Sequence, residues 1–270
     1  MGSGRGCARP TWQARLTAAT LGLLLMACAS LQADTVATVT VRNPSAQPRT
    51  EIISLRLRDI PLELPATGSL GVRDATGQAL KAQWDDLDLS GGPTAEDGLA
   101  VQVSCGPYEA VTLTVGPGSA AASTARPLPP DQTVSAGPFK LRMSPGGWLS
   151  ELRVGDGPSL IGGLWHTLYS GGFNPPATWD QRGLKATLVH CQGPLRQVVY
   201  AAYDFDERPF HADALARWAG DLKPGCRAEA LLSILPDHLT ATITVLPRET
   251  AFAVEESRVV LALPLPGGEP

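Results

Sequence analysis

The sequence has few charged and aromatic residues and no hydrophobic run long enough to cross a membrane. Of its 270 residues, 18% are charged and 6% are aromatic, while 43% are hydrophobic. Its main apolar stretch, Leu16 to Ala27, is 12 residues long, whereas a membrane-spanning helix needs about 20. The hydrophobic share is typical of a globular protein with a core rather than of a disordered chain. We therefore expect a folded chain with one large domain or two modest ones.

The signatures of several chemical functions are also missing. The sequence has no glycine-rich phosphate loop, no βαβ alternation and no Gly-x-Ser-x-Gly nucleophile turn. No cysteines have the close Cys-x-x-Cys spacing of a zinc site. A net charge of −4 gives the chain no electrostatic reason to bind nucleic acid. We therefore expect no nucleic-acid partner and no cofactor, and the sequence leaves open whether the protein is an enzyme.

Residues 1–33 have the features of an export signal. Three arginines precede the apolar stretch, as in secretory leaders, and no acidic residue occurs before Asp34. Three interpretations stay open: a lipoprotein signal with Cys28 acylated, an ordinary signal peptide cleaved after Ala29 or Ala33, or a retained helix. Under the first two, a bacterial protein would be secreted, periplasmic or lipid-anchored at the cell envelope. The lipid on Cys28 is the one membrane contact that we expect.

Residues 35–117 have the pattern of a small β-barrel or sandwich. Val36 to Arg42 alternates apolar and polar residues and then stops at Asn43-Pro44, which is typical of a strand that ends in a turn. Four more short apolar segments follow at the spacing of a small barrel or sandwich. They are Ile52 to Leu57, Leu70 to Arg73, Leu99 to Val103 and Ala110 to Val115.

Residues 118–132 are rich in Pro, Ala and Ser and are expected to be a linker. Residues 133–270 contain a second series of strand candidates. They are Phe139 to Met143, Leu149 to Val154, Leu184 to His190, Gln197 to Tyr203, Ala228 to Ile234, Leu239 to Val245 and Ser257 to Leu263. Ala212 to Ala219 is ambiguous between helix and strand and is assigned to strand. The predicted fold class is all-β, with the first unit followed by a second, antiparallel β-sandwich.

Short motifs in both units resemble known bacterial families. In the first unit they are Val39 to Pro44, Arg49, Val72 to Gly77, Gln83 to Asp86 and Val111 to Val115; in the second they are Ser135 to Lys140 and Gly146 to Leu152. The first unit resembles the N-terminal β-domain of secreted rhamnogalacturonan-lyase-like and YetA-like proteins. The second is similar to the opening of galactose-mutarotase-like sandwiches. This resemblance implies a carbohydrate partner and a sugar-binding face on the second unit.

Aromatic residues are concentrated in the second unit, where nine of the 15 fall between Trp165 and Trp218. Sugars present apolar C–H faces and a rim of hydroxyls, so flat rings beside charged groups suit a sugar site. Residues 165–182, rich in Gly and Pro, are expected to form a long irregular loop of the kind that is often functional. The alternative is that the rings form the core. The candidate binding residues are Trp165, Tyr169, Trp179, Asp180, Arg196, Tyr203 and Asp204.

The same segment offers groups for proton transfer. His166 or His211 beside an aspartate can supply the acid and base that epimerisation, mutarotation or uronate β-elimination requires. Arg182 can neutralise a uronate carboxylate. These three residues are the catalytic candidates. The first hypothesis is binding of a polysaccharide or oligosaccharide; the alternatives are a lyase or epimerase for uronic-acid sugars and a non-catalytic envelope β-sandwich.

Four oxygen-bearing residues have the spacing of the start of a calcium loop, namely Asp86, Asp88, Ser90 and Asp97. The last of these is not the Glu that such loops use, and no flanking helices are expected, so we expect no metal.

Three cysteines remain beyond the leader: Cys105, Cys191 and Cys226. They allow at most one disulfide. Cys191 and Cys226 can meet only if their strands are neighbours, and the alternative is three buried thiols.

Overall fold

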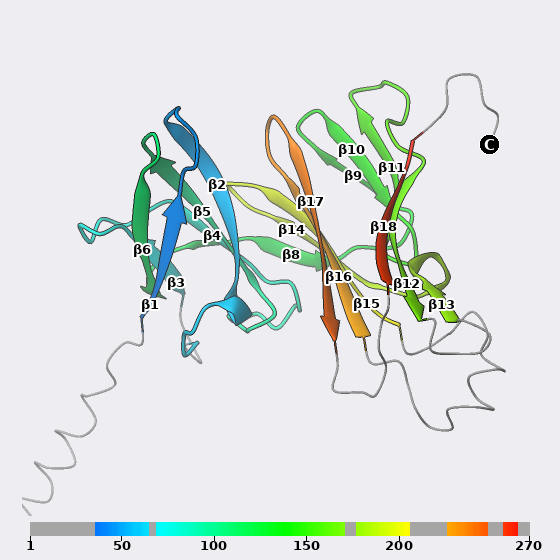
Figure 1. Cartoon of the computed structure of the whole chain (residues 1–270), viewed down its shortest axis with the longest axis horizontal. Helices are drawn as coiled ribbons and strands as arrows, with labels where there is room; N and C mark the ends of the chain where they lie inside the picture. Colours follow the sequence, from blue (N-terminus) through cyan, green and yellow to red (C-terminus); the bar gives the residue numbers. More distant parts are fainter. Residues whose placement is uncertain (1–35, 65–68, 171–176, 206–225, 248–255, 264–270) are drawn as a thin grey trace, which may run out of the picture.

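The computed structural model describes residues 36–64, 69–170, 177–205, 226–247 and 256–263 (Figure 1). In this part of the chain the regular structure consists of β-strands and two short 3-10 turns, η2 (Leu57–Asp59) and η3 (Gln181–Gly183). The prediction of an all-β fold is thus confirmed. Among these residues, no helix is long and apolar enough to span a membrane. The predicted leader, His211 and segment 212–219 lie outside the described residues.

The first unit is a sandwich of two sheets. A three-stranded sheet has the order β1-β6-β3 and a four-stranded sheet the order β2-β5-β4-β7. Their strands are β1 (Ala37–Arg42), β2 (Arg49–Arg56), β3 (Leu70–Arg73), β4 (Ala82–Asp85), β5 (Gly98–Cys105), β6 (Ala110–Pro117) and β7 (Ala121–Ala122). Val72, Leu99, Val101 and Leu113 are almost inaccessible and form the core between the two sheets.

The second unit is a larger sandwich. Its five-stranded sheet has the order β17-β16-β15-β14-β8, and its six-stranded sheet has the order β13-β12-β11-β10-β9, with β18 also paired to β12. The strands are β8 (Thr124–Pro127), β9 (Thr133–Ala136), β10 (Phe139–Met143), β11 (Leu149–Val154), β12 (Gly163–Ser170), β13 (Ala177–Asp180), β14 (Thr187–Gln192), β15 (Gln197–Asp204), β16 (Cys226–Ile234), β17 (Leu239–Pro247) and β18 (Glu256–Ala262). Leu141, Val199 and Leu232 lie in the core between these sheets.

The connection between the units takes part in both. β7 pairs in parallel with β4 of the first unit, and β8, two residues later, pairs with β14 of the second. Segment 118–132, expected as a linker, therefore contributes a strand to a sheet on each side.

The four sheets stack in layers. Figure 1 shows the three-stranded, four-stranded, five-stranded and six-stranded sheets following one another across the molecule. Because alternate side chains of a strand point to opposite faces, the two middle sheets each have one face in their own core and one face toward the other unit. On β15, Val199 packs into the second unit's core, while Val198 and Tyr200 pack with Leu87 of the first unit.

A buried ion pair lies in the contact between the units. The Arg196 guanidinium donates to Oδ2 of Asp85 at 3.1 and 2.7 Å, and the two side chains are 1% and 0% exposed. Arg196 also donates to the hydroxyls of Ser54 and Ser233. The amide of Gln83, fully buried beside the pair, donates to Asp85 and to the Arg196 carbonyl. The two charges buried between the units are therefore paired with each other and hydrogen-bonded, which a buried ion pair requires.

One expectation from the sequence is wrong. Residues 165–182 are not a long irregular loop, because their described parts contain β12, β13 and η3. Of the two alternatives for the cysteines, buried thiols are observed at both positions whose side chains the structure describes, because Cys105 and Cys191 are free and buried. Burial raises the pKa of the Cys191 thiol to about 12. The strand register explains why Cys191 is free: Cys191 lies opposite Val198 at one end of the five-stranded sheet, whereas Cys226 begins β16 at the other end.

Candidate functional site

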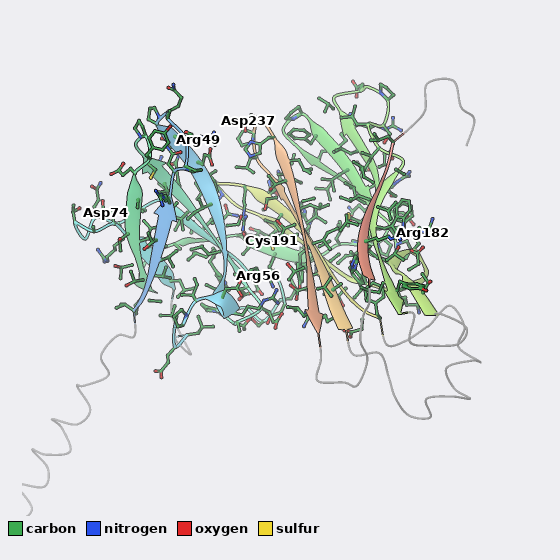
Figure 2. All side chains as sticks on the ribbon, in the orientation of Figure 1. Arg49, Arg56, Asp74, Arg182, Cys191 and Asp237 are labelled. Atoms are coloured by element: carbon green, nitrogen blue, oxygen red, sulfur yellow. The ribbon has the colours of Figure 1, made fainter. Side chains whose placement is uncertain are left out.

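The exposed face of the six-stranded sheet carries a group of aromatic and charged side chains, here called the tryptophan–arginine cluster: Trp148, Trp165, Asp180 and Arg182. The rings of Trp148 and Trp165 meet edge to face, with centroids 5.9 Å apart and planes at 73°. The guanidinium carbon of Arg182 lies 4.5 Å from the centroid of the Trp165 ring. Such stacking of a guanidinium on a Trp ring is a favourable cation–π contact. Figure 2 shows Arg182 on the side of the second unit remote from the first.

Strand alternation places the cluster on this face. Along β12, Leu164 and Leu168 pack into the core of the sandwich, so Trp165 and Tyr169 point outward. Gly163 allows the two tryptophans to approach, because a Cβ at this position would lie 2.7 Å from the Trp148 ring and 3.1 Å from that of Trp165. Only glycine leaves room for both rings.

Asp180 holds Arg182 in place. One carboxylate oxygen accepts from the backbone N–H of Arg182 at 2.9 Å, which caps η3, and the other accepts from its guanidinium at 2.9 and 2.5 Å. The hydrogen bond to Asp180 raises the pKa of Arg182. The Arg182 side chain is 52% exposed and that of Asp180 is 13% exposed. The arginine is therefore fixed in orientation while its charge still faces solvent.

A shallow hollow of about 220 Å³ lies on the same face, over β9, β10 and β11. Charged and polar side chains line it, including Thr133, Lys140, Glu151 and Arg153. Glu151 is shared by two cations, Arg142 at 3.0 Å and Arg153. The exposed face thus combines an aromatic cluster with a strip of hydrogen-bonding groups.

Three of the residues singled out in the sequence come together here: Trp165, Asp180 and Arg182. Tyr169 is half-buried on the outward side of β12. The backbone of Trp179 pairs with Leu168, and its side chain lies outside the described residues.

Other candidates lie inside the protein. His166 is 0% exposed and packs edge to face against Phe205, with ring centroids 5.5 Å apart. Burial lowers its pKa to about 4, so the imidazole is neutral near pH 7. Tyr203 is 3% exposed and also packs against Phe205. Asp204, half-buried, ends β15.

Arg196 lies between the units in the ion pair with Asp85 and is not on the exposed face. Trp148, in contrast, belongs to the cluster although the sequence marks it only as part of the motif Gly146 to Leu152 and not as a binding residue. It precedes the aromatic-rich segment by 17 positions, and only the pairing of Leu149 with Leu164 brings it beside Trp165. The Gly-Gly turn directly before it is the sequence signal that marks a hairpin there.

The acidic loop after β4 brings three carboxylates together. Ligand oxygens of Asp86, Asp88 and Asp97 lie within 4.8 Å of one another, so these residues are the ones that could hold a cation. Each already accepts hydrogen bonds within the loop: Asp97 from the N–H groups of Leu87 and Thr94, at 2.8 and 2.9 Å, and Asp86 and Asp88 from Ser90. These hydrogen bonds explain why the loop contains three carboxylates: each one accepts N–H groups of the loop and so stabilises its shape.

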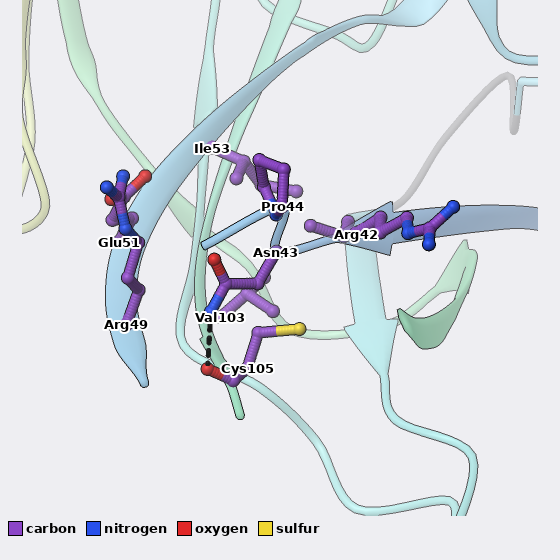
Figure 3. Close-up of a pocket in the computed structure, with 9 residues that line it drawn as sticks. Arg42, Asn43, Pro44, Arg49, Glu51, Ile53, Val103 and Cys105 are labelled. Carbon is purple, nitrogen blue, oxygen red and sulfur yellow. Dashed lines mark hydrogen bonds and ion pairs between the residues drawn. The ribbon is translucent and has the colours of Figure 1, made fainter. Parts of the chain in front are cut away.

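A small hollow in the first unit is too small for a sugar. It has a volume of about 70 Å³ and lies beside Asn43, Arg49, Glu51 and Cys105 (Figure 3), whereas ligand pockets usually measure roughly 300 Å³ or more. Asn43 donates to the carbonyls of Gln47 and Cys105 at 2.8 and 3.3 Å, so it stabilises the turn after β1.

Comparison with known proteins leaves the family open. No family model matches the sequence, and no curated protein matches it. Among solved structures, an alpha-mannosidase from Enterococcus faecalis V583 is similar at 14% identity, with a TM-score of 0.37. The match covers 90% of this chain and 34% of that one, so the chain spans about a third of its length. A TM-score this low does not establish a shared fold, and the function has to be inferred from the residues of this chain.

Proposed function

We propose that the protein is exported and binds a polysaccharide through the exposed face of its six-stranded sheet. The tryptophan–arginine cluster is the observation that carries this proposal. Indole rings can contact the C–H faces of sugars, and a fixed guanidinium beside them can donate to hydroxyl or carboxylate oxygens. The export signal of residues 1–33 would bring the protein to the compartment where such polymers occur.

The arrangement favours a chain of sugars over a single sugar. The hollow on β9–β11 and the cluster around β12 are at least one strand apart. Since neighbouring strands lie about 4.8 Å apart, a ligand that touches Trp165 and a residue of β10 must span about 10 Å. A polymer lying across the strands meets both regions, with its apolar faces on the rings and its hydroxyls over Lys140, Glu151 and Arg153.

Binding rather than catalysis is proposed because of where the described catalytic candidates and Asp180 lie. His166 is enclosed between the sheets, and the Asp180 carboxylate is engaged by Arg182. Neither group reaches a ligand on the exposed face as a free acid or base.

Affinity electrophoresis through gels that contain galactan, xylan or polygalacturonate tests the proposal. We expect at least one polymer to retard the wild-type protein. Trp148→Ala combined with Trp165→Ala should weaken that retardation at least about tenfold, equivalent to about 1.4 kcal/mol. Tyr108→Ala is the matched control, because this ring is 64% exposed but lies on the first unit. Binding that survives the double substitution, or no retardation by any polymer in a wider panel, would contradict the proposal and favour a structural envelope protein.

A further inference from the structure

A third hollow lies between the two units and has a volume of about 330 Å³. Side chains of β1, β2 and the η2 turn of the first unit form one wall, and side chains of β16 and β17 form the other. Figure 2 shows Arg56, which lines it, between the units. The volume is at the lower end of the range for small-molecule sites, roughly 300–1,000 Å³, and domain interfaces are a frequent place for such sites. This hollow is called the inter-unit cleft below.

The base of the cleft is a network of ion pairs between arginine and glutamate side chains. Glu229 is 2% exposed and accepts from the Arg58 guanidinium through both oxygens, at 3.0 and 2.8 Å. Arg56 lies 3.2 Å from the same carboxylate, and its guanidinium stacks 5.3 Å from the centroid of the Tyr200 ring. Burial alone would raise the pKa of Glu229, but the Arg58 hydrogen bond and the charges of Arg56 and Arg58 lower it overall.

Arg227 and Glu96 extend this network: Arg227 lies 3.5 Å from Glu229 and 3.4 Å from Glu96, and Glu96 lies 3.6 Å from Arg58. Counting Asp59, which also lines the cleft, three carboxylates offset the three arginines, so the network has no net charge.

The wall from the second unit presents hydroxyls. In the register of β16 with β17, Thr244 lies opposite Glu229 and Thr242 lies opposite Leu231. Facing residues of neighbouring antiparallel strands share one side of the sheet, so both threonines border the cleft beside the ion-pair network. Their hydroxyls can donate and accept hydrogen bonds.

The wall from the first unit adds Asp59 and Arg56 together with apolar side chains such as Ile60. Asp59 is exposed at the rim. The cleft thus offers two hydroxyls, an acceptor carboxylate and an apolar wall around a base whose charges are already paired. A neutral molecule with several hydroxyls and a C–H face matches this combination, because it needs hydrogen bonds and an apolar contact but no counter-charge.

We propose that the inter-unit cleft binds a small neutral saccharide, of one or two sugar units, that contacts both units. This site is independent of the polysaccharide face, which lies on the opposite side of the second unit. A ligand held by both walls would also stabilise the contact between the units.

Calorimetric titration of the full chain tests this inference, with glucose, galactose, mannose, maltose and lactose as neutral probes and glucuronate and galacturonate as charged ones. We expect at least one neutral probe to bind and to raise the melting temperature by a few degrees. Thr242→Val combined with Thr244→Val removes both hydroxyls while keeping the side-chain shape, and should weaken binding at least about tenfold.

Two control variants are compared with the threonine double variant. Thr240→Val is the matched control, because Thr240 precedes the two threonines on the same face of β17 but does not line the cleft. The Thr240→Val variant should bind the probe like the wild type. The Trp148→Ala, Trp165→Ala variant should do so as well, because the cleft is independent of the polysaccharide face.

The inference is overturned if no neutral probe binds, if only the uronates bind, or if the threonine double variant binds like the wild type while its melting temperature is unchanged. Loss of binding in the tryptophan variant alone would place the sugar on the exposed face instead and leave the cleft without a role.

Discussion

Burial decides the chemistry of individual side chains in this protein. His166 and Arg182 were both selected from the sequence as catalytic candidates, yet one is fully enclosed and the other is half exposed. Desolvation disfavours the charged imidazole and lowers the pKa of His166 to about 4. Arg182 keeps its charge because Asp180 lies against it. β12 therefore supplies a buried structural residue, and η3, which follows β13, supplies a surface residue.

The low pKa of His166 predicts a pH-dependent stability. The unfolded chain binds a proton on this residue near pH 6.5, whereas the folded chain does so only near pH 4. Stability is therefore complete above pH 6.5 and falls as the pH drops from 6.5 to 4, by up to roughly 3 kcal/mol. Urea unfolding at pH 7 and pH 5 measures this loss.

His166→Leu should reduce the difference between the two pH values. His190, whose pKa burial also lowers, should keep part of it. His238→Gln is the control, since His238 is exposed in the turn before β17. An unchanged pH dependence in the Leu variant would contradict the assignment.

At the scale of elements, the loop between β4 and β5 owes its shape to carboxylates that accept backbone N–H groups. Asp97 is 0% exposed and accepts from Leu87, Thr94 and the Trp84 indole, the last at 3.1 Å. Burial raises the pKa of Asp97 despite these hydrogen bonds. The loop packs against the second unit through Leu87, so its shape also affects the contact between the units.

Asp97→Asn should destabilise the protein by about 1–3 kcal/mol. The reason is that the Asn NH₂ group would face backbone N–H groups of the loop, which now donate to the carboxylate. Asp88→Asn, on the exposed side of the same loop, should cost less than about 1 kcal/mol. Denaturant midpoints of the two variants provide the measurement. An equal loss of stability in the two variants would contradict the idea that the burial of Asp97 makes its hydrogen bonds more important than those of Asp88.

Calcium should not stabilise this loop. The carboxylate oxygens already serve as hydrogen-bond acceptors within it. We expect the same melting temperature in millimolar calcium and in EDTA. A rise with calcium that Asp97→Asn removes would show that the three aspartates form a cation site after all.

At the scale of the whole molecule, the two sandwiches meet through a contact that contains buried charge. Asp85 comes from the first unit and Arg196 from the second, and the Arg58–Glu229 pair crosses the same contact. Removing one partner of a buried pair leaves the other charged and unpaired, which costs far more than the pair contributes. The contact should therefore couple the unfolding of the two units.

Arg196→Met should destabilise the protein by about 3–5 kcal/mol and split one calorimetric transition into two. Adding Asp85→Leu should recover part of the loss, because an apolar pair encloses no charge. Glu51→Gln breaks the exposed pair with Arg49, whose side chains are 53% and 58% exposed, and should change stability by less than about 1 kcal/mol. A single, barely shifted transition in the Arg196 variant would show that the units are not coupled through this pair.

The sequence by itself determined the all-β class and many strands, because period-two alternation is a property of consecutive residues. Phe139 to Met143 and Leu149 to Val154 were expected as strands and are β10 and β11. The same logic missed β12, where Trp165 and Tyr169 on the outer side and Leu164 and Leu168 on the inner side leave no alternation to detect.

Only the tertiary structure decided which rings are exposed and which charges are paired. Trp148 meets Trp165 through strand pairing, and Arg196 meets Asp85, 111 positions away, because two sandwiches stack on each other. Whether a face of a strand is covered depends on the layer that packs over it. That layer comes from distant parts of the chain, so it cannot be predicted from a local pattern of residues.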